Sequence, residues 1–173
     1  MNLTSLKEVR EKIALLFLDS LGGQSILDGS SYERIVDIGT GAGFPGIPLQ
    51  IMYPEKMFYL LDSRAKKAAF LINVLGKLHI SSAKVLQQRI EDIARLGTFH
   101  EKCDLAMMKG VNSSQVAPYL KDIIHENGQV LIFRTSRTEV PHSDNGLLRI
   151  KEFSYELPFG HGKRMIELLQ FKK

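Results

Sequence analysis

The sequence contains a single cysteine, Cys103, among its 173 residues. One thiol excludes a disulfide within the chain and a zinc site built from cysteines, so the composition suits a reducing cytoplasm. The five histidines are scattered along the chain and lack the short spacing that is typical of a zinc site. We therefore expect no resident metal.

The chain also lacks an apolar run long enough to cross a bilayer and a charged-then-apolar leader with a cleavage site. It shows no internal repeat and no low-complexity segment. We expect a cytoplasmic protein that does not enter a membrane. A length of 173 residues predicts one domain with a sizeable core, residues 1–173, in which residues 1–30 form an N-terminal helical extension.

The net charge is mildly positive, at +4. A basic excess of this size permits a nucleic acid partner without requiring one. A surface charged only for solubility explains the same value equally well, so the charge alone leaves both interpretations open.

One stretch, residues 34–49, organises the rest of the chain. Residues 35–38 form a short β-branched run typical of a buried strand. Residues 39–46 hold four glycines in eight residues, where the backbone must turn sharply and lie close to something. An apolar pattern that suits a helix resumes at residues 47–52. A strand, a glycine loop and a helix start form the cofactor-facing corner of an α/β sheet.

The glycine pattern leaves two cofactors to distinguish. Residues 41–46 satisfy G-x-G-x-x-G, and Asp62 lies roughly twenty residues further on, as in a dinucleotide site. However, glycines at alternate positions after Asp37 favour S-adenosylmethionine (SAM), whose methionine part needs backbone contacts from a tight loop. Asp62, at the end of the next predicted strand, would then bind the ribose diol of SAM.

Strands and helices alternate along most of the chain. Strands are predicted at 35–38, 57–61, 83–87, 103–108, 130–133, 147–157 and 164–171, and the main helices at 3–21, 47–52, 63–78 and 115–124. The first helix carries an apolar stripe that includes Val9, Ile13 and Phe17. This alternation predicts an α/β protein with a doubly wound sheet.

A longer string is more specific than either glycine motif. Residues 37–49, Asp-Ile-Gly-Thr-Gly-Ala-Gly-Phe-Pro-Gly-Ile-Pro-Leu, are followed by Leu-Leu-Asp-Ser at 60–63 and Lys-Lys-x-x-Phe-Leu at 66–71. Together they closely resemble the glucose-inhibited division protein B family, also called ribosomal RNA small subunit methyltransferase G. The resemblance implies a single Rossmann-like, class I SAM-dependent methyltransferase domain, with a mostly parallel sheet and an antiparallel C-terminal hairpin.

The resemblance also implies an activity and a set of cofactor contacts. Members of the family transfer a methyl group from SAM to N7 of a guanine in 16S rRNA and release S-adenosylhomocysteine. The positions in this chain that match the family's cofactor site are Asp37, Gly39, Thr40, Gly41, Gly43, Phe44, Asp62, Ile90, Glu91 and Lys109. From the residues alone, a favourable charge at a helix start is the better explanation of Glu91.

Two features differ from the family pattern. Lys109 stands where the family has an arginine, and it keeps the charge without the planar guanidinium. Residues 17–21 resemble the family's His-x-x-Asp-Ser-Leu stretch but lack the histidine, and members usually carry some tens of residues more before it.

The expected partner is 16S rRNA or the small ribosomal subunit, bound by a monomer. Candidate RNA contacts are Lys66, Lys67, Arg134 and Arg164, although the residues alone slightly favour a solvated helix face or loop for the first three. Guanine N7 carries a lone pair and no proton, so the transfer needs no general base, and the sequence names no catalytic residue. Positioning of the two reactants would supply most of the catalysis.

Two alternatives remain at this point. A degenerate homologue would bind SAM or RNA without transferring a methyl group, as the shorter N-terminal segment, Lys109 and Arg134 would permit. A nicotinamide-dependent oxidoreductase would also use G-x-G-x-x-G, but the chain is short for the usual additional substrate domain.

Overall fold

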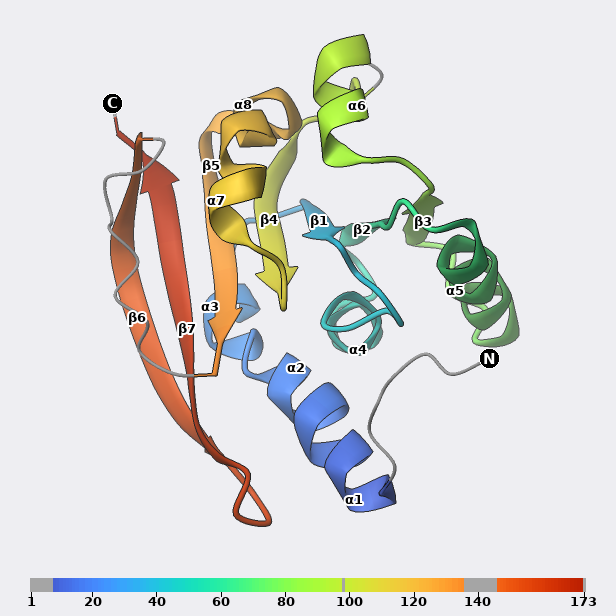
Figure 1. Cartoon of the computed structure of the whole chain (residues 1–173), viewed down its shortest axis with the longest axis vertical. Helices are drawn as coiled ribbons and strands as arrows, with labels where there is room; N and C mark the ends of the chain where they lie inside the picture. Colours follow the sequence, from blue (N-terminus) through green and yellow to red (C-terminus); the bar gives the residue numbers. More distant parts are fainter. Residues whose placement is uncertain (1–7, 98, 136–145, 173) are drawn as a thin grey trace.

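A computed structural model describes residues 8–97, 99–135 and 146–172 and shows one seven-stranded sheet flanked by helices (Figure 1). The strand order is β3-β2-β1-β4-β5-β7-β6. The strands are β1 (Arg34–Ile38), β2 (Met57–Leu61), β3 (Ala83–Leu86), β4 (Cys103–Lys109), β5 (Ile124–Arg134), β6 (Leu147–Leu157) and β7 (Gly162–Phe171).

The first five strands run parallel, and β7 pairs antiparallel with β5 and with β6. The chain proceeds outward from β1 through β2 to β3, and then returns to place β4 on the other side of β1. This reversal is a topological switch point, the place where open α/β sheets bind ligands at the carboxyl ends of their strands. The predicted mostly parallel sheet with an antiparallel C-terminal hairpin is confirmed.

Helices cover both faces of the sheet (Figure 1). The helices of one face are α3 (Gln24–Leu27), α4 (Gly46–Met52) and α5 (Ala65–Lys77), and those of the other are α6 (Ile90–Leu96), α7 (Ser113–Val116) and α8 (Leu120–Ile123). Alternate residues of each strand enter opposite cores: Ile35 packs with the first set of helices and Val36 with the second. Among the described residues, no helix has the length and apolar character needed to cross a membrane.

The segment before β5 differs from the prediction of one helix over 115–124. It is divided among α7, a 3₁₀ turn η2 (Ala117–Tyr119) and α8, with Pro118 inside the 3₁₀ turn. Because proline lacks the amide hydrogen that a continuous helix would use, it interrupts the regular pattern. β5 also begins earlier than predicted, at Ile124, and its pairing with β4 shifts in register between Cys103 and Leu105.

The N-terminal helix buries a different face from the one that its apolar stripe predicts. The described part consists of α1 (Val9–Lys12), a π-helical segment η1 (Ile13–Leu18) and α2 (Asp19–Leu21); its predicted first residues lie outside the described part. Val9 and Phe17 are exposed, whereas Asp19 and Ser20 are buried. A π-helical segment has more residues per turn than an α-helix, which changes the face that later residues present. The apolar-stripe prediction was therefore wrong, and a carboxylate enters the interior.

Glu167 on β7 forms the centre of a buried ion cluster in the C-terminal part of the sheet. Its carboxylate contacts Arg134 on β5 and lies 3.1 Å from the guanidinium of Arg149 on β6. The Glu167 side chain is only 1% exposed. The pair with Arg134 therefore links β7 of the antiparallel hairpin to β5, the last parallel strand.

We predict that Glu167→Gln destabilises the protein by about 2–3 kcal/mol, because it leaves the largely buried guanidinium of Arg134 without its anion, whereas Arg149 keeps Glu152. The melting temperature in a thermal unfolding experiment should fall by roughly 5–10 °C. Asp92→Asn is the control, since it breaks the exposed Asp92–Arg95 pair and should change the melting temperature little. Equal shifts for the two variants would contradict this account.

Candidate functional site

The loop between β1 and α4 lies at the switch point and is built from backbone. The Gly39 and Thr40 amides both donate to the Leu61 carbonyl, at 2.8 and 3.0 Å, which ties the loop to the end of β2. Gly39 has a φ of +71°, and a Cβ there would lie 2.6 Å from the Val111 side chain. Only glycine fits this conformation and this space, so the loop presents its main chain to any ligand.

Asp37 anchors the loop from beneath. Its side chain is fully buried, and Oδ2 accepts a hydrogen bond of 2.8 Å from the Gly46 amide at the start of α4. Burial raises the pKa of Asp37 to about 6, although the Thr40 hydroxyl, the Gly46 amide and the Lys109 ammonium all act to lower it. The sheet therefore holds a carboxylate that is costly to ionise at neutral pH.

Two buried polar atoms beneath the loop lack a hydrogen bond of normal geometry within the described residues. They are Asp37 Oδ1 and Thr40 Oγ1. Buried polar atoms in native proteins are nearly always satisfied, so such atoms indicate a ligand, ion or water. A positively charged or hydrogen-bonding group at the loop would satisfy both.

Asp62 follows β2 at the same edge of the sheet. Its side chain is 3% exposed. Oδ2 accepts from the Gly41 amide at 3.1 Å, and Oδ1 accepts from the Arg64 amide at 3.0 Å. The contacts fix this carboxylate next to the glycine loop, where its remaining lone pairs suit a pair of hydroxyl groups.

A cleft of about 220 Å³ opens at the carboxyl ends of the first four strands. Four of the predicted cofactor residues line it: Gly39, Asp62, Ile90 and Glu91. The structure adds residues that the sequence analysis did not identify, namely Gln88 and Arg89 before α6 and Val111, Asn112 and Gln115 after β4. Gln115 lies in α7 and the others lie in loops after strands, and no motif in the sequence distinguishes them.

The two candidate RNA lysines on α5 lie differently. Lys66 is exposed, whereas the Lys67 side chain is only 20% exposed and its ammonium lies 3.7 Å from Asp62 Oδ2. A Cβ on Gly41 would lie 3.3 Å from the same ammonium. Lys67 therefore faces the glycine loop and Asp62, on the cofactor side of the predicted site.

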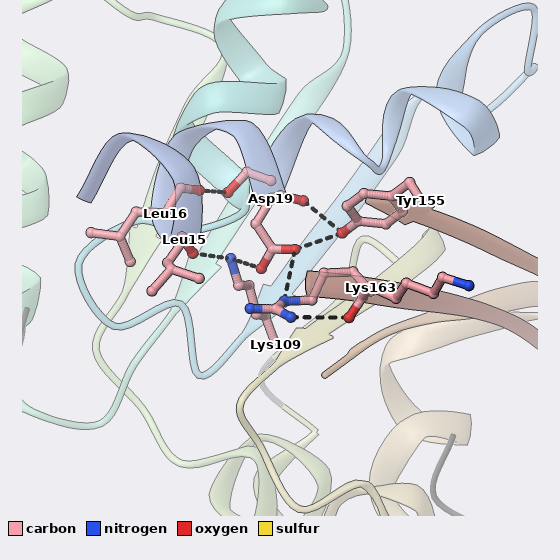
Figure 2. A network of polar contacts seen from close by, with 8 residues as sticks. Leu15, Leu16, Asp19, Lys109, Tyr155 and Lys163 are labelled. Atoms are coloured by element: carbon pink, nitrogen blue, oxygen red, sulfur yellow. Dashed lines mark hydrogen bonds and ion pairs between the residues drawn. The ribbon is translucent and has the colours of Figure 1, made fainter. Parts of the chain in front are cut away.

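Lys109 lies outside the cleft, in a buried polar cluster (Figure 2). Its ammonium is 2.5 Å from Asp19 Oδ2 on α2 and donates to the Leu15 carbonyl at 2.9 Å. Arg164, another predicted RNA contact, enters the same cluster, with Nε 3.9 Å from Asp19 Oδ1. The sequence placed Asp19 in a stretch resembling a family motif but did not identify its partners.

Two other predicted residues have partners within the fold. Phe44 packs edge-on against Phe17 of the N-terminal helix, with ring centroids 4.9 Å apart. Arg134 is bound to Glu167 and its side chain is 14% exposed, so little of its guanidinium is free for RNA. Within the described ranges, no group of three His, Cys, Asp or Glu side chains is arranged to hold a metal ion.

Comparison with known proteins supports the family resemblance. A family described as rRNA small subunit methyltransferase G matches residues 1–166. The ribosomal RNA small subunit methyltransferase G of Fusobacterium nucleatum subsp. nucleatum is 37% identical, over 99% of this chain and 76% of that protein. The Desulfitobacterium hafniense protein of the same name is 38% identical, over 80% of this chain and 57% of that protein. The chain thus spans three quarters of one relative and little more than half of another.

Solved structures with the same fold have low sequence identity. A crystal structure of MtNAS in complex with MTA and tNA gives a TM-score of 0.68 at 18% identity, over 91% of this chain and 60% of that one. TrmN from Thermus thermophilus gives a TM-score of 0.67 at 14% identity, over 88% of this chain and 48% of that one. These likenesses concern the fold alone.

We predict that Asp37→Asn stabilises the protein most at neutral pH. The pKa of Asp37 is higher in the folded state than the usual carboxyl value of 3.8, so its protonated form favours folding below about pH 4. That contribution is lost as the pH rises through about 6, and the amide variant does not lose it.

The stability of Asp37→Asn relative to wild type should therefore rise by about 3 kcal/mol between pH 4 and pH 7.5. Urea unfolding at the two pH values measures the change. A stability difference that stays constant with pH would show that Asp37 ionises without cost.

Proposed function

The chain belongs to the rRNA small subunit methyltransferase G family, and we propose that it transfers a methyl group from SAM to N7 of a guanine in 16S rRNA. The observation that carries the proposal is that a glycine loop, the fixed Asp62 carboxylate and a cleft lie together at the switch point. The product would be S-adenosylhomocysteine. Residues 1–173 would act as one methyltransferase domain, with residues 1–30 as its helical extension.

We assign residues of the site to each part of the cofactor. Asp62 would bind the ribose hydroxyls, since its carboxylate is held at the mouth of the cleft by backbone amides. Ile90 is buried at the start of α6 and would pack on the adenine, with Glu91 beside it. The backbone from Gly39 to Phe44, including Thr40, Gly41 and Gly43, would bind the methionine end.

Charge complementarity supports the same orientation. SAM carries a positive sulfonium and a positive ammonium at its methionine end. Asp37, whose Oδ1 has no hydrogen bond of normal geometry to the described residues, supplies negative charge there. The methionine end of SAM also carries a negative carboxylate. Lys109 lies near enough to lower the pKa of Asp37, and its ammonium would face that carboxylate.

Bound SAM supplies the methyl group as a reactive sulfonium substituent. Guanine N7 needs no deprotonation, so the protein's residues would act by holding the base in line with the methyl group and by excluding water. Because N7 lies in the closed major groove of paired RNA, the target guanine would be unpaired or otherwise accessible.

The expected RNA-facing surface is the edge of the sheet around the cleft. Lys66 is exposed on α5, whereas the Arg164 side chain is 13% exposed and lies beside Asp19, so little of its guanidinium is free for RNA. Lysine and arginine contacts with phosphate would make RNA binding dependent on salt. A bacterial 16S rRNA substrate would place the protein in the cytoplasm, as a monomer bound to the small ribosomal subunit.

Methyl transfer is tested with radiolabelled SAM and small ribosomal subunits from bacteria that lack this methyltransferase. The proposal predicts that a single guanine of 16S rRNA carries the label. The RNA chain should then be open to chemical cleavage at this N7-methylguanosine. Protein that binds SAM but labels neither subunits nor free 16S rRNA would instead support a degenerate homologue.

Asp62→Ala should weaken SAM binding by on the order of 10- to 100-fold, because it removes the acceptor for the ribose hydroxyls. Calorimetric titration measures the dissociation constant. Asp92→Ala is the matched control: Asp92 is an acid on α6 that pairs with Arg95 and does not line the cleft. Equal affinities for wild type and Asp62→Ala would remove Asp62 from the site.

A further inference from the structure

A cluster of charged and polar side chains joins the N-terminal helix to three strands (Figure 2). At its centre is Asp19 on α2, whose Oδ2 lies 2.5 Å from the Lys109 ammonium at the end of β4. The Tyr155 hydroxyl on β6 donates to Asp19 Oδ1 at 2.7 Å, and Arg164 Nε on β7 lies 3.9 Å from the same oxygen. Asp19 thus contacts a base or donor from three separate strands.

The cluster is nearly closed to solvent. The side chains of Asp19, Lys109 and Arg164 are 7, 18 and 13% exposed. Taking charges out of water is costly, and apolar residues of similar size often give equal or greater stability. Stability alone therefore does not explain why a carboxylate lies here. The place of the cluster next to the glycine loop offers another reason.

Lys109 borders the cofactor corner. It follows Met108, which pairs with Ile38 of β1, so it lies beside Gly39 at the start of the glycine loop. The same N-terminal helix reaches that loop again through Phe17, which packs edge-on against Phe44. Asp19 and Phe17 together place the helix against the loop and against Lys109.

The charge of Lys109 depends on its neighbours. Burial lowers the pKa of the ammonium, and Arg164 lowers it further, whereas Asp19 and Asp37 raise it. The Tyr155 hydroxyl is neutral, because burial and Asp19 raise the pKa of Tyr155 far above its usual value. Asp19 makes the closest contact with Lys109 and is therefore the main group that keeps it charged.

We propose that Asp19 is a positioning residue for the cofactor site: its carboxylate holds Lys109 protonated and aimed at the methionine end of the SAM site. This role rests on the proposed function. It assigns Asp19 no contact with the cofactor, so its effect on binding must pass through Lys109.

A double-mutant cycle tests that dependence. Asp19→Asn should weaken SAM binding at pH 7 by on the order of tenfold, as expected for a misplaced charged contact. In a Lys109→Met background, Asp19→Asn should change the dissociation constant less than about twofold. The same loss in both backgrounds would overturn the proposal.

The pH profile supplies a readout that a merely structural role would not change. Without Asp19, the pKa of Lys109 falls further, so the ammonium loses its proton at lower pH. SAM binding by Asp19→Asn should therefore decline at a lower alkaline pH than binding by wild type. Identical alkaline limits would overturn the proposal.

Asp28→Asn is the matched control, because Asp28 also accepts a hydrogen bond from a tyrosine, Tyr53, but lies outside the cluster. It should leave both the affinity and the pH profile unchanged. If Asp19→Asn does not fold, Asp19→Glu keeps the charge and displaces it by one methylene. That variant should weaken binding and keep the wild-type alkaline limit, and wild-type affinity would overturn the proposal.

These binding measurements distinguish a failure of the proposed function from a failure of the role of Asp19. Wild-type protein that binds neither SAM nor S-adenosylhomocysteine would overturn the proposed function and this role together. Wild-type binding with an additive cycle would overturn only the role of Asp19.

Discussion

The buried carboxylate of Asp37 is the constraint on which the rest of the site depends. It accepts a hydrogen bond from the Gly46 amide, the first of α4, and so fixes where the glycine loop ends and the helix begins. It is also a negative charge enclosed by the sheet, which needs positive charge nearby. A series of side chains with alternating charge leads away from Asp37. Lys109 lies near Asp37, Asp19 pairs with Lys109, and Arg164 lies near Asp19.

That sequence of charges connects parts of the chain that are far apart in sequence. Lys109 belongs to the parallel sheet, Asp19 to the N-terminal helix and Arg164 to the C-terminal hairpin. The cofactor corner is therefore held by elements from both ends of the chain as well as by its own glycine loop. Phe17 against Phe44 adds an apolar contact at the same junction. A methyltransferase that works by positioning needs such rigidity where the two reactants meet.

The sequence predicted most of the fold because its strands carry local signals. β1, β2 and β4 are short apolar runs followed by glycine or aspartate, and four glycines mark the turn between β1 and α4. The glycine pattern and the end of the second predicted strand indicated Asp62, and the family resemblance supplied Ile90 and Glu91; all three line the cleft. Gln88, Asn112 and Gln115 were missed because their place depends on how the segments that follow different strands meet. The buried face of the N-terminal helix was predicted wrongly because a π-helical segment changes its phase, and tertiary contacts of Asp19 leave no local pattern.

The most direct test of this account is a pH titration of Asp37, in which carbon NMR monitors the carboxyl group with and without SAM. The account predicts a pKa of about 6 in the free protein and a clear decrease when the positively charged cofactor binds. A carboxyl group that titrates near the ordinary aspartate value, or that does not respond to SAM, would contradict it.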